Sequence, residues 1–284
     1  MRILLIGKTG QVGRELLSAL PAVGDVVATD RAQLDLADFQ AIRRVTREAR
    51  ADVIVNAAAY TAVDRAERES ELAMAVNGSA PGVIAEEAKR LGALLVHYST
   101  DYVFDGNKTT PYAEEDSTGP LNVYGKSKLA GEAAIRSSGC RYLILRSSWV
   151  YGPHGSNFFL TIARRALAGE DLRVVADQTG VPTTSAFVAD VTAQITGKGT
   201  PGSGVYHAVP EGQTTWFDFA RAIVDGLGAK VRVTPITSEE FRAPAKRPRY
   251  SVLDNSKIRK DFNIIPARWD AHLRQCLLES RQNI

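Results

Sequence analysis

The start of the chain constrains the fold most strongly, because a glycine-rich turn separates a short apolar run from an amphipathic segment. Residues 3–6 are continuously apolar, which is typical of a buried parallel strand. Gly7, Gly10 and Gly13 follow, and residues 14–20 have helical spacing. This order predicts a unit that binds a dinucleotide, with the positive end of the helix toward the phosphates. The spacing departs from G-x-G-x-x-G, and a glycine-rich turn without a ligand is the alternative.

Further apolar runs alternate with helical patterns along most of the chain. Strands are predicted at residues 25–30, 51–56, 93–99, 141–146 and 204–209. This alternation predicts a Rossmann-type α/β fold with a doubly wound parallel sheet. We expect residues 1–148 and 175–209 to form this dinucleotide-binding domain. A smaller substrate-binding α/β domain is expected mainly from residues 149–174 and 210–284.

Composition narrows the functional class. The formal net charge of +3 over 284 residues is too small to indicate nucleic-acid binding. No apolar stretch approaches the length that spans a membrane, and the apolar strand at the start leaves no room for a signal peptide. Cys140 and Cys276 have no paired spacing, which favours thiols in a reducing compartment. We therefore expect a cytoplasmic protein, and no metal site is predicted because the four histidines lack ligand spacing.

The second predicted strand ends in an acidic residue, Asp30, about twenty residues after the glycine turn. A carboxylate there can accept hydrogen bonds from the adenosine ribose, although a strand-end cap is the alternative. Arg31 follows and would tolerate a 2′-phosphate, so both NADPH and NADH remain candidate cofactors. The other predicted cofactor contacts lie in the glycine turn and at strand ends: Thr9, Gln11, Val12, Asp35, Leu36, Ala58, Ala59, Tyr60, Thr61, Tyr98, Tyr124 and Lys128.

Tyr124 and Lys128 are four residues apart, which places both side chains on one face of a helix. A phenol beside an ammonium is a proton donor with a lowered pKa, and an unperturbed tyrosine has a pKa of about 10. The spacing alone is common among solvated surface pairs. Together with a cofactor turn, it indicates hydride transfer coupled to proton transfer.

Several longer stretches resemble the extended branch of the short-chain dehydrogenase/reductase superfamily, which acts on nucleotide sugars. They lie at residues 7–13, 55–64, 97–104, 120–125, 146–151 and 214–216. The run Ser-Thr-Asp-Tyr-Val-Phe at residues 99–104 is more specific than the glycine turn. Within that branch the chain is similar to the dTDP-4-dehydrorhamnose reductase family. This similarity implies NAD(P)H-dependent reduction of the C4 ketone of dTDP-4-dehydro-L-rhamnose to dTDP-L-rhamnose.

The resemblance also implies roles for individual residues. Tyr124 is expected to act as the general acid, and Lys128 to supply a positive charge and hold the nicotinamide ribose. Ser99 and Thr100 point to opposite sides of a strand, and the resemblance favours Thr100 for the hydrogen bond to the substrate oxygen. The expected substrate contacts are Thr100, Asp101, Tyr102, Asn122, Trp149, Asn157 and Arg247. Core packing is the alternative for Trp149, and a solvated basic loop for Arg247.

Two other functions stay open from the sequence. One is a different nucleotide-sugar epimerase or 4-ketoreductase of the extended branch, and the other is a non-catalytic regulatory subunit with the same fold. The expected partner is a dTDP-sugar substrate, with no nucleic acid and no membrane. Because relatives dimerise in some cases, a homodimer is the assembly to test.

Overall fold

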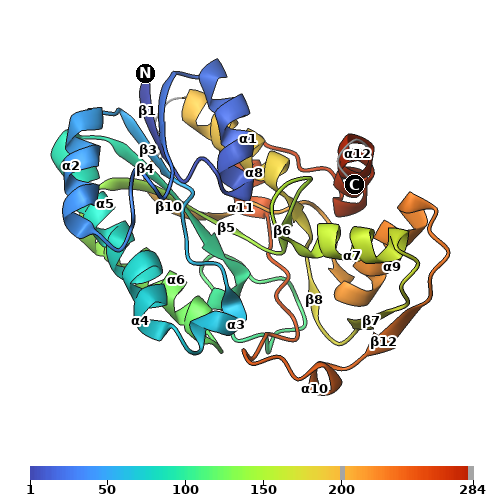
Figure 1. Cartoon of the computed structure of the whole chain (residues 1–284). Coiled ribbons are helices and arrows are strands. Elements are labelled where there is room, and N and C mark those ends of the chain that lie inside the picture. Colours follow the sequence, from blue (N-terminus) through green and yellow to red (C-terminus); the bar gives the residue numbers. More distant parts are fainter. Residues whose placement is uncertain (199–201, 281–284) are drawn as a thin grey trace.

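A parallel sheet forms the centre of the larger part of the molecule. The computed structural model describes residues 1–198 and 202–280 (Figure 1). Six of the described strands pair in parallel in the order β10-β5-β4-β3-β1-β2. Their bounds are Arg2–Ile6 for β1, Asp25–Thr29 for β2, Val53–Asn56 for β3, Leu94–Thr100 for β4, Arg141–Ser147 for β5 and Gly204–His207 for β10. The predicted strands and their parallel pairing are confirmed.

Helices cover both faces of this sheet, as the apolar composition of its strands requires. One face packs against α1 (Gln11–Ala19), α8 (Ser185–Gly197) and α11 (Ser256–Phe262). The opposite face packs against α2 (Phe39–Ala49), α5 (Ala80–Leu91) and α6 (Val123–Ser138), and this second layer lies on the left in Figure 1. The predicted doubly wound α/β fold is therefore confirmed.

The strand order locates the ligand crevice. The chain leaves β1 toward β2 at one edge and then returns past β1 to β3 on the other side. Ligands of doubly wound sheets bind outside the carboxyl ends of the strands at such a reversal. The glycine turn after β1 and the strand end at Asn56 consequently face the same crevice.

A second apolar cluster lies beyond the sheet and includes the C-terminal helices. Its helices are α7 (Phe158–Leu167), α9 (Trp216–Leu227) and α12 (Trp269–Ser280). Short strand pairs accompany them: β6 (Val150–Tyr151) with β9 (Thr183–Thr184), β7 (Leu172–Val175) with β12 (Val233–Ile236), and β8 (Thr179–Gly180) with β11 (Thr214–Thr215). The predicted domain boundaries stay a prediction, and residues 281–284 of the second unit lie outside the described residues.

Several short elements complete the fold. They are α3 (Val63–Ala66), α4 (Ser70–Met74), a π-helical turn η2 (Ala75–Ser79), the 3₁₀ turns Leu20–Ala22 and Asp101–Val103, and α10 (Ser238–Phe241). Among the helices of the described residues, none is both long and apolar enough to cross a bilayer.

A buried ion pair joins α6 to β5. Arg146 donates to both carboxylate oxygens of Glu132 at 2.9 and 2.7 Å, and both side chains are at most 3% exposed. The Arg146 guanidinium also donates to the Glu114 carbonyl and lies over the Phe104 ring. Two buried charges are tolerated here because each is paired and hydrogen-bonded.

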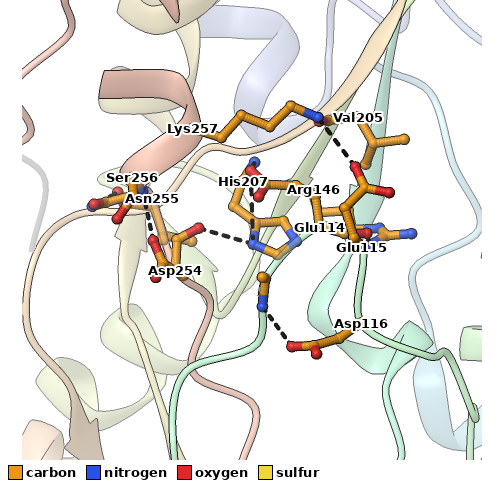
Figure 2. Close-up of polar contacts among 12 residues, drawn as sticks. Glu114, Glu115, Asp116, Arg146, Val205, His207, Asp254, Asn255, Ser256 and Lys257 are labelled. Atoms are coloured by element: carbon orange, nitrogen blue, oxygen red, sulfur yellow. Dashed lines mark hydrogen bonds and ion pairs between the residues drawn. The ribbon is translucent and has the colours of Figure 1, made fainter. Parts of the chain in front are cut away.

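The same polar cluster holds the end of β10 in place (Figure 2). The backbone N–H of His207 donates to Glu114 Oε1 at 2.9 Å. In the side chain of His207, Nδ1 lies 3.0 Å from the Asp254 carbonyl. Burial, reinforced by the Arg146 charge, lowers the pKa of His207 to about 3, so the ring is neutral. Lys257 reaches the Val205 carbonyl at 2.9 Å and Glu115 at 3.5 Å. These contacts connect residues 114–115 and 254–257 to the main sheet.

Replacing Arg146 with methionine is expected to lower the free energy of unfolding by about 3–5 kcal/mol, because Glu132 would be left buried without a counter-charge. The double variant Arg146→Met/Glu132→Leu is expected to recover most of that loss. Urea unfolding of the wild type and both variants measures this. A single variant as stable as the double variant would contradict the explanation.

Candidate active site

A large cleft opens at the carboxyl ends of the central strands. Its volume is about 980 Å³, and its wall runs from the glycine turn past the ends of β3 and β4 to Trp149 and Trp216. Among the predicted cofactor positions, only Gly13 is missing from the wall. The substrate positions that line it are Thr100, Asp101, Tyr102, Trp149 and Asn157. One continuous cleft therefore contains most of the predicted residues.

Close packing explains two of the three glycines in the turn. Gly7 has φ +92°, and a Cβ there would lie 2.7 Å from the Ala58 nitrogen. A Cβ on Gly13 would lie 2.0 Å from the Gly7 carbonyl oxygen, so α1 could not approach the turn. Gly13 thus acts by packing rather than by lining the cleft.

Gly10 has a different role, because it stands at the N-terminus of α1. Among the described residues, no side chain caps this helix end, so its first N–H groups remain available. Free N–H groups at the positive end of a helix fit the pyrophosphate of a dinucleotide. The turn therefore fits a cofactor of the NAD(P) type.

The acidic end of β2 is braced by its neighbours. Asp30 Oδ1 accepts the N–H groups of Ala32 and Gln33, and Oδ2 lies 3.4 Å from Lys8 Nζ. The backbone hydrogen bond from Gln33, aided by Lys8, holds the pKa of Asp30 below its ordinary value. Arg31 is 81% exposed beside it. An ionised carboxylate and an adjacent exposed guanidinium suit a ribose with or without a 2′-phosphate.

Tyr124 and Lys128 both line the cleft, but their electrostatics differ from the sequence-based expectation. Burial, and then the charge of Asp101, raises the pKa of Tyr124 to about 12, while a hydrogen bond with Thr100 acts in the opposite direction. Burial lowers the pKa of Lys128 to about 8. The expected lowering of the Tyr124 pKa is therefore wrong, because Lys128 Nζ lies 3.3 Å from His97 Nε2 and the buried phenol loses hydration.

Ser99 and Thr100 are separated by the alternation of the strand, as expected. The Ser99 hydroxyl donates to Glu132 at 2.5 Å, beneath α6. The Thr100 hydroxyl lines the cleft, donates to Asp101 Oδ1 at 3.1 Å and accepts the Tyr102 N–H at 3.2 Å. Both residues line the cleft, but the Ser99 hydroxyl is bonded to Glu132, whereas the Thr100 hydroxyl hydrogen-bonds with Tyr124.

Asp101 is a buried carboxyl group at the same strand end. It is 2% exposed, and among the described residues its Oδ2 atom has no hydrogen-bond partner. Burial raises its pKa to about 7, although hydrogen bonds from Ser251 and Thr100 act against this. Near neutral pH, this group is therefore divided between a neutral acid and a carboxylate.

Asn77 is a buried residue of the site region that the sequence analysis missed. It lies in the π-helical turn η2, a feature that is frequent at functional sites. Its Oδ1 accepts the Tyr60 N–H at 2.8 Å, and its Nδ2 donates to the Tyr60 carbonyl and to Ser127 Oγ. Asn77 thus fixes the predicted cofactor segment at Tyr60 against α6. A single asparagine inside a helical pattern carries no signal that would have indicated this.

The far end of the cleft is aromatic. The rings of Trp149 and Trp216 stack with centroids 3.6 Å apart and planes 8° apart. Trp149 has φ +47°, an uncommon value for a residue with a side chain, and a Cβ on Gly180 would lie 2.5 Å from its ring. The stacked rings pack against each other and also line the cleft, and the predicted contact of Trp149 with substrate stays a prediction.

Asn157 connects the two ends of the cleft. Its Oδ1 accepts the Leu160 N–H and caps α7, while its Nδ2 donates to Gln11 Oε1 at 2.8 Å. The residue therefore ties the aromatic end to the glycine turn.

Comparison with known proteins agrees with this geometry. The family model described as RmlD substrate binding domain matches residues 1–282. The dTDP-4-dehydrorhamnose reductases of Burkholderia thailandensis and Escherichia coli (strain K12) are 43% and 41% identical, each over 98% of both chains. A crystal structure of dTDP-4-dehydrorhamnose reductase from Bacillus anthracis in complex with NADP has a TM-score of 0.94 and 36% identity, covering 98% of this chain and 99% of that chain.

The chain belongs to the dTDP-4-dehydrorhamnose reductase family. Its resemblance to this family, predicted from the sequence, is confirmed. Within the described residues, no group of three or more His, Cys, Asp or Glu side chains is arranged to hold a metal ion.

Two predicted substrate residues of this family member lie outside the cleft wall. Asn122 caps α6 through Gly125 and donates from Nδ2 to the Lys246 carbonyl at 2.8 Å. Arg247 makes a two-pronged pair with Asp64, with both distances 3.0 Å. Both side chains hold the segment 245–247 against the N-terminal part of the chain. Their predicted contact with substrate stays a prediction.

The buried carboxyl group of Asp101 generates a testable pH dependence of stability. Its folded pKa of about 7 lies above the ordinary value of 3.8. The stabilisation from the protonated form is fully present below about pH 4 and is lost as the pH rises toward 7, at roughly 1.4 kcal/mol per pH unit. Asp101→Asn cannot ionise, so its stability relative to the wild type is expected to be higher at pH 8 than at pH 5. Urea unfolding at both pH values measures this difference.

Asp105→Asn provides a control whose effect should not change between the two pH values. The hydrogen bond from Tyr112 holds the pKa of Asp105 below its ordinary value. The stabilisation from that carboxylate is present above about pH 4 and lost at lower pH, so the stability of this variant relative to the wild type is expected to be the same at pH 5 and pH 8. A relative stability of Asp101→Asn that is independent of pH would contradict the effect of burial.

Proposed function

We propose that the protein reduces the C4 ketone of dTDP-4-dehydro-L-rhamnose to dTDP-L-rhamnose with NADPH or NADH. One observation carries the proposal: Thr100, Tyr124 and Lys128 lie in the same cleft as the glycine turn. Membership of the reductase family, whose Bacillus anthracis member was crystallised with NADP, supports the same reaction and cofactor. When bound, the nicotinamide supplies the hydride.

The glycine turn and the open end of α1 would hold the pyrophosphate, with Asp30 at the adenosine ribose. Arg31 would approach a 2′-phosphate when NADPH is used, and Asp30 would bond the free hydroxyl of NADH. The segment at Ala58–Tyr60 would border the nicotinamide half. We propose these contacts because each of the residues lines the cleft wall.

Tyr124 would give its proton to the ketone oxygen as negative charge develops there. A phenol with a pKa of about 12 holds its proton throughout the neutral range. Because an alkoxide is a stronger base than a phenolate, transfer from such a phenol is still favourable. Thr100 would donate a hydrogen bond to the same oxygen, and the Lys128 charge would stabilise the phenolate that remains.

The aromatic end of the cleft suits the rest of the substrate. A stacked pair of indoles offers a flat apolar surface to a thymine base or to the apolar face of a sugar. Asp101 and Asn157 offer polar atoms nearby. We place the nucleotide sugar between Trp149 and Tyr124.

The direct test follows NAD(P)H absorbance with dTDP-4-dehydro-L-rhamnose and each cofactor. Stoichiometric oxidation of the cofactor supports a reductase. An epimerase would leave absorbance unchanged while altering the sugar, and a regulatory subunit would act only on the kinetics of a partner enzyme. A homodimer and a cytoplasmic location stay predictions, of which the first is measured by light scattering after size-exclusion chromatography.

Tyr124→Phe is expected to lower turnover by roughly 100- to 10,000-fold, because the proton donor is lost, while cofactor affinity stays close to wild type. Steady-state kinetics and fluorescence titration with NADPH measure the two quantities. Tyr142→Phe on β5 is the matched control, and it should retain turnover. Near-normal turnover of Tyr124→Phe would refute the assignment of the acid.

Lys128→Ala is expected to weaken NADPH binding by roughly 10- to 100-fold in addition to lowering turnover, because charged hydrogen bonds contribute about 1.5–3 kcal/mol each. Lys126→Ala is the control, since Lys126 is exposed on the same helix. Calorimetric titration compares both variants with the wild type. Unchanged affinity of Lys128→Ala would exclude the ribose contact.

A further inference from the structure

Lys128 has a buried neighbour that the reaction described above does not use. His97 on β4 is 1% exposed, and Lys128 is 3% exposed. His97 Nε2 lies 3.3 Å from Lys128 Nζ, and His97 Nδ1 lies 3.2 Å from Asn56 Nδ2. Asn56 is the residue of β3 that pairs with His97 in the sheet register. A continuous polar chain therefore runs from the strand end at Asn56 to the proposed catalytic lysine.

The direction of this chain follows from the donors and acceptors. Asn56 Oδ1 accepts the Ala58 N–H at 3.3 Å, so the amide NH₂ is the group that faces the ring. An NH₂ group only donates, and His97 Nδ1 must therefore accept. A neutral imidazole that accepts at Nδ1 carries its proton on Nε2, and this N–H faces Lys128.

The contact with Lys128 depends on the charge of the lysine. An ammonium group has three donors and no acceptor, so the His97 N–H and a charged Lys128 would repel each other. A neutral amine has a lone pair that can accept the same N–H. The distance of 3.3 Å is thus a hydrogen bond only when Lys128 is neutral.

We propose that His97 is a positioning residue that holds Lys128 in its neutral form and turns the charged form toward the cleft. This deepens the proposed reduction and rests on it. After Tyr124 has given its proton to the product oxygen, the Lys128 ammonium transfers one proton to the phenolate. The phenol is restored, the lysine remains as an amine that accepts the His97 N–H, and a proton from water later recharges it.

The surrounding charges agree with this role. Burial holds the pKa of His97 well below its ordinary value, and the Lys128 charge acts in the same direction. Glu132 on α6 favours the Lys128 ammonium, but it is itself paired with Arg146 from β5. Tyr124 lies on the same face of α6 as Lys128 and Glu132 and is also ionisable. Among the described residues, the hydrogen-bond partner of His97 on its far side is the Asn56 amide, which does not titrate, so His97 supports the lysine without conducting protons to solvent.

The first test uses no activity measurement. The chain has four histidines, so selective ¹⁵N labelling of the full protein gives a simple spectrum. We expect His97 to be neutral with its proton on Nε2 from about pH 6 to 9. A proton on Nδ1, or an imidazolium in this range, overturns the proposal. His97→Gln assigns the signal, and variants of the other three histidines assign it by elimination if that variant does not fold. A wrong substrate would leave this spectrum unchanged, which separates the two failures.

The second test is the pH profile of turnover. In His97→Gln, the side-chain oxygen can face Lys128 and accept from the ammonium, so the basic limb of the kcat profile should move up by about one pH unit. His154→Gln is the matched control and should keep the wild-type profile. A basic limb of His97→Gln within about 0.3 pH unit of wild type overturns the proposal, even if kcat falls, because a purely structural role changes rate without changing the limb.

Discussion

The attachment of α6 to β4 through buried polar side chains is the constraint on which the site depends. Lys128 reaches His97 and Glu132 reaches Ser99, while Arg146 neutralises Glu132. Polar contacts between a helix and a sheet specify one position, because any displacement leaves buried groups without partners. The phenol of Tyr124 is carried by the same helix, so its place at the end of β4 follows from contacts deeper in the molecule.

Burial then sets the chemistry of these groups. The same exclusion of water that raises the pKa of Tyr124 and Asp101 lowers that of Lys128. Each group is displaced toward its neutral form, which is the direction that desolvation requires. A hydride acceptor that becomes negative would therefore meet a protonated phenol, with a lysine nearby that can change its charge near neutral pH. Burial therefore sets the protonation states from which the proposed proton transfers between Lys128, Tyr124 and the ketone would start.

The sequence predicted the sheet and the cleft better than the electrostatics. Apolar runs ended by Gly7, Asn56 and Thr100 indicated strands, and parallel strands bring their carboxyl ends to one edge. The strand order that creates the reversal beside β1 depends on tertiary packing. Likewise, the pairing of Arg247 with Asp64 joins residues far apart in the chain, so the sequence offered only a substrate contact or a solvated basic loop for Arg247. Local spacing carries no information about such partners.

The hydrogen bond between Asn157 and Gln11 extends this dependence to the substrate end of the cleft. Gln11 is the first residue of α1, directly after the uncapped position where phosphate would bind, and Asn157 begins the helix beneath the stacked indoles. Movement of the glycine turn would therefore displace α7 and Trp216, because Trp216 packs against Phe158 of that helix. In the proposed arrangement, the cofactor and sugar sites would share this hydrogen-bonded connection, which would help to set the distance between hydride donor and ketone before either ligand binds.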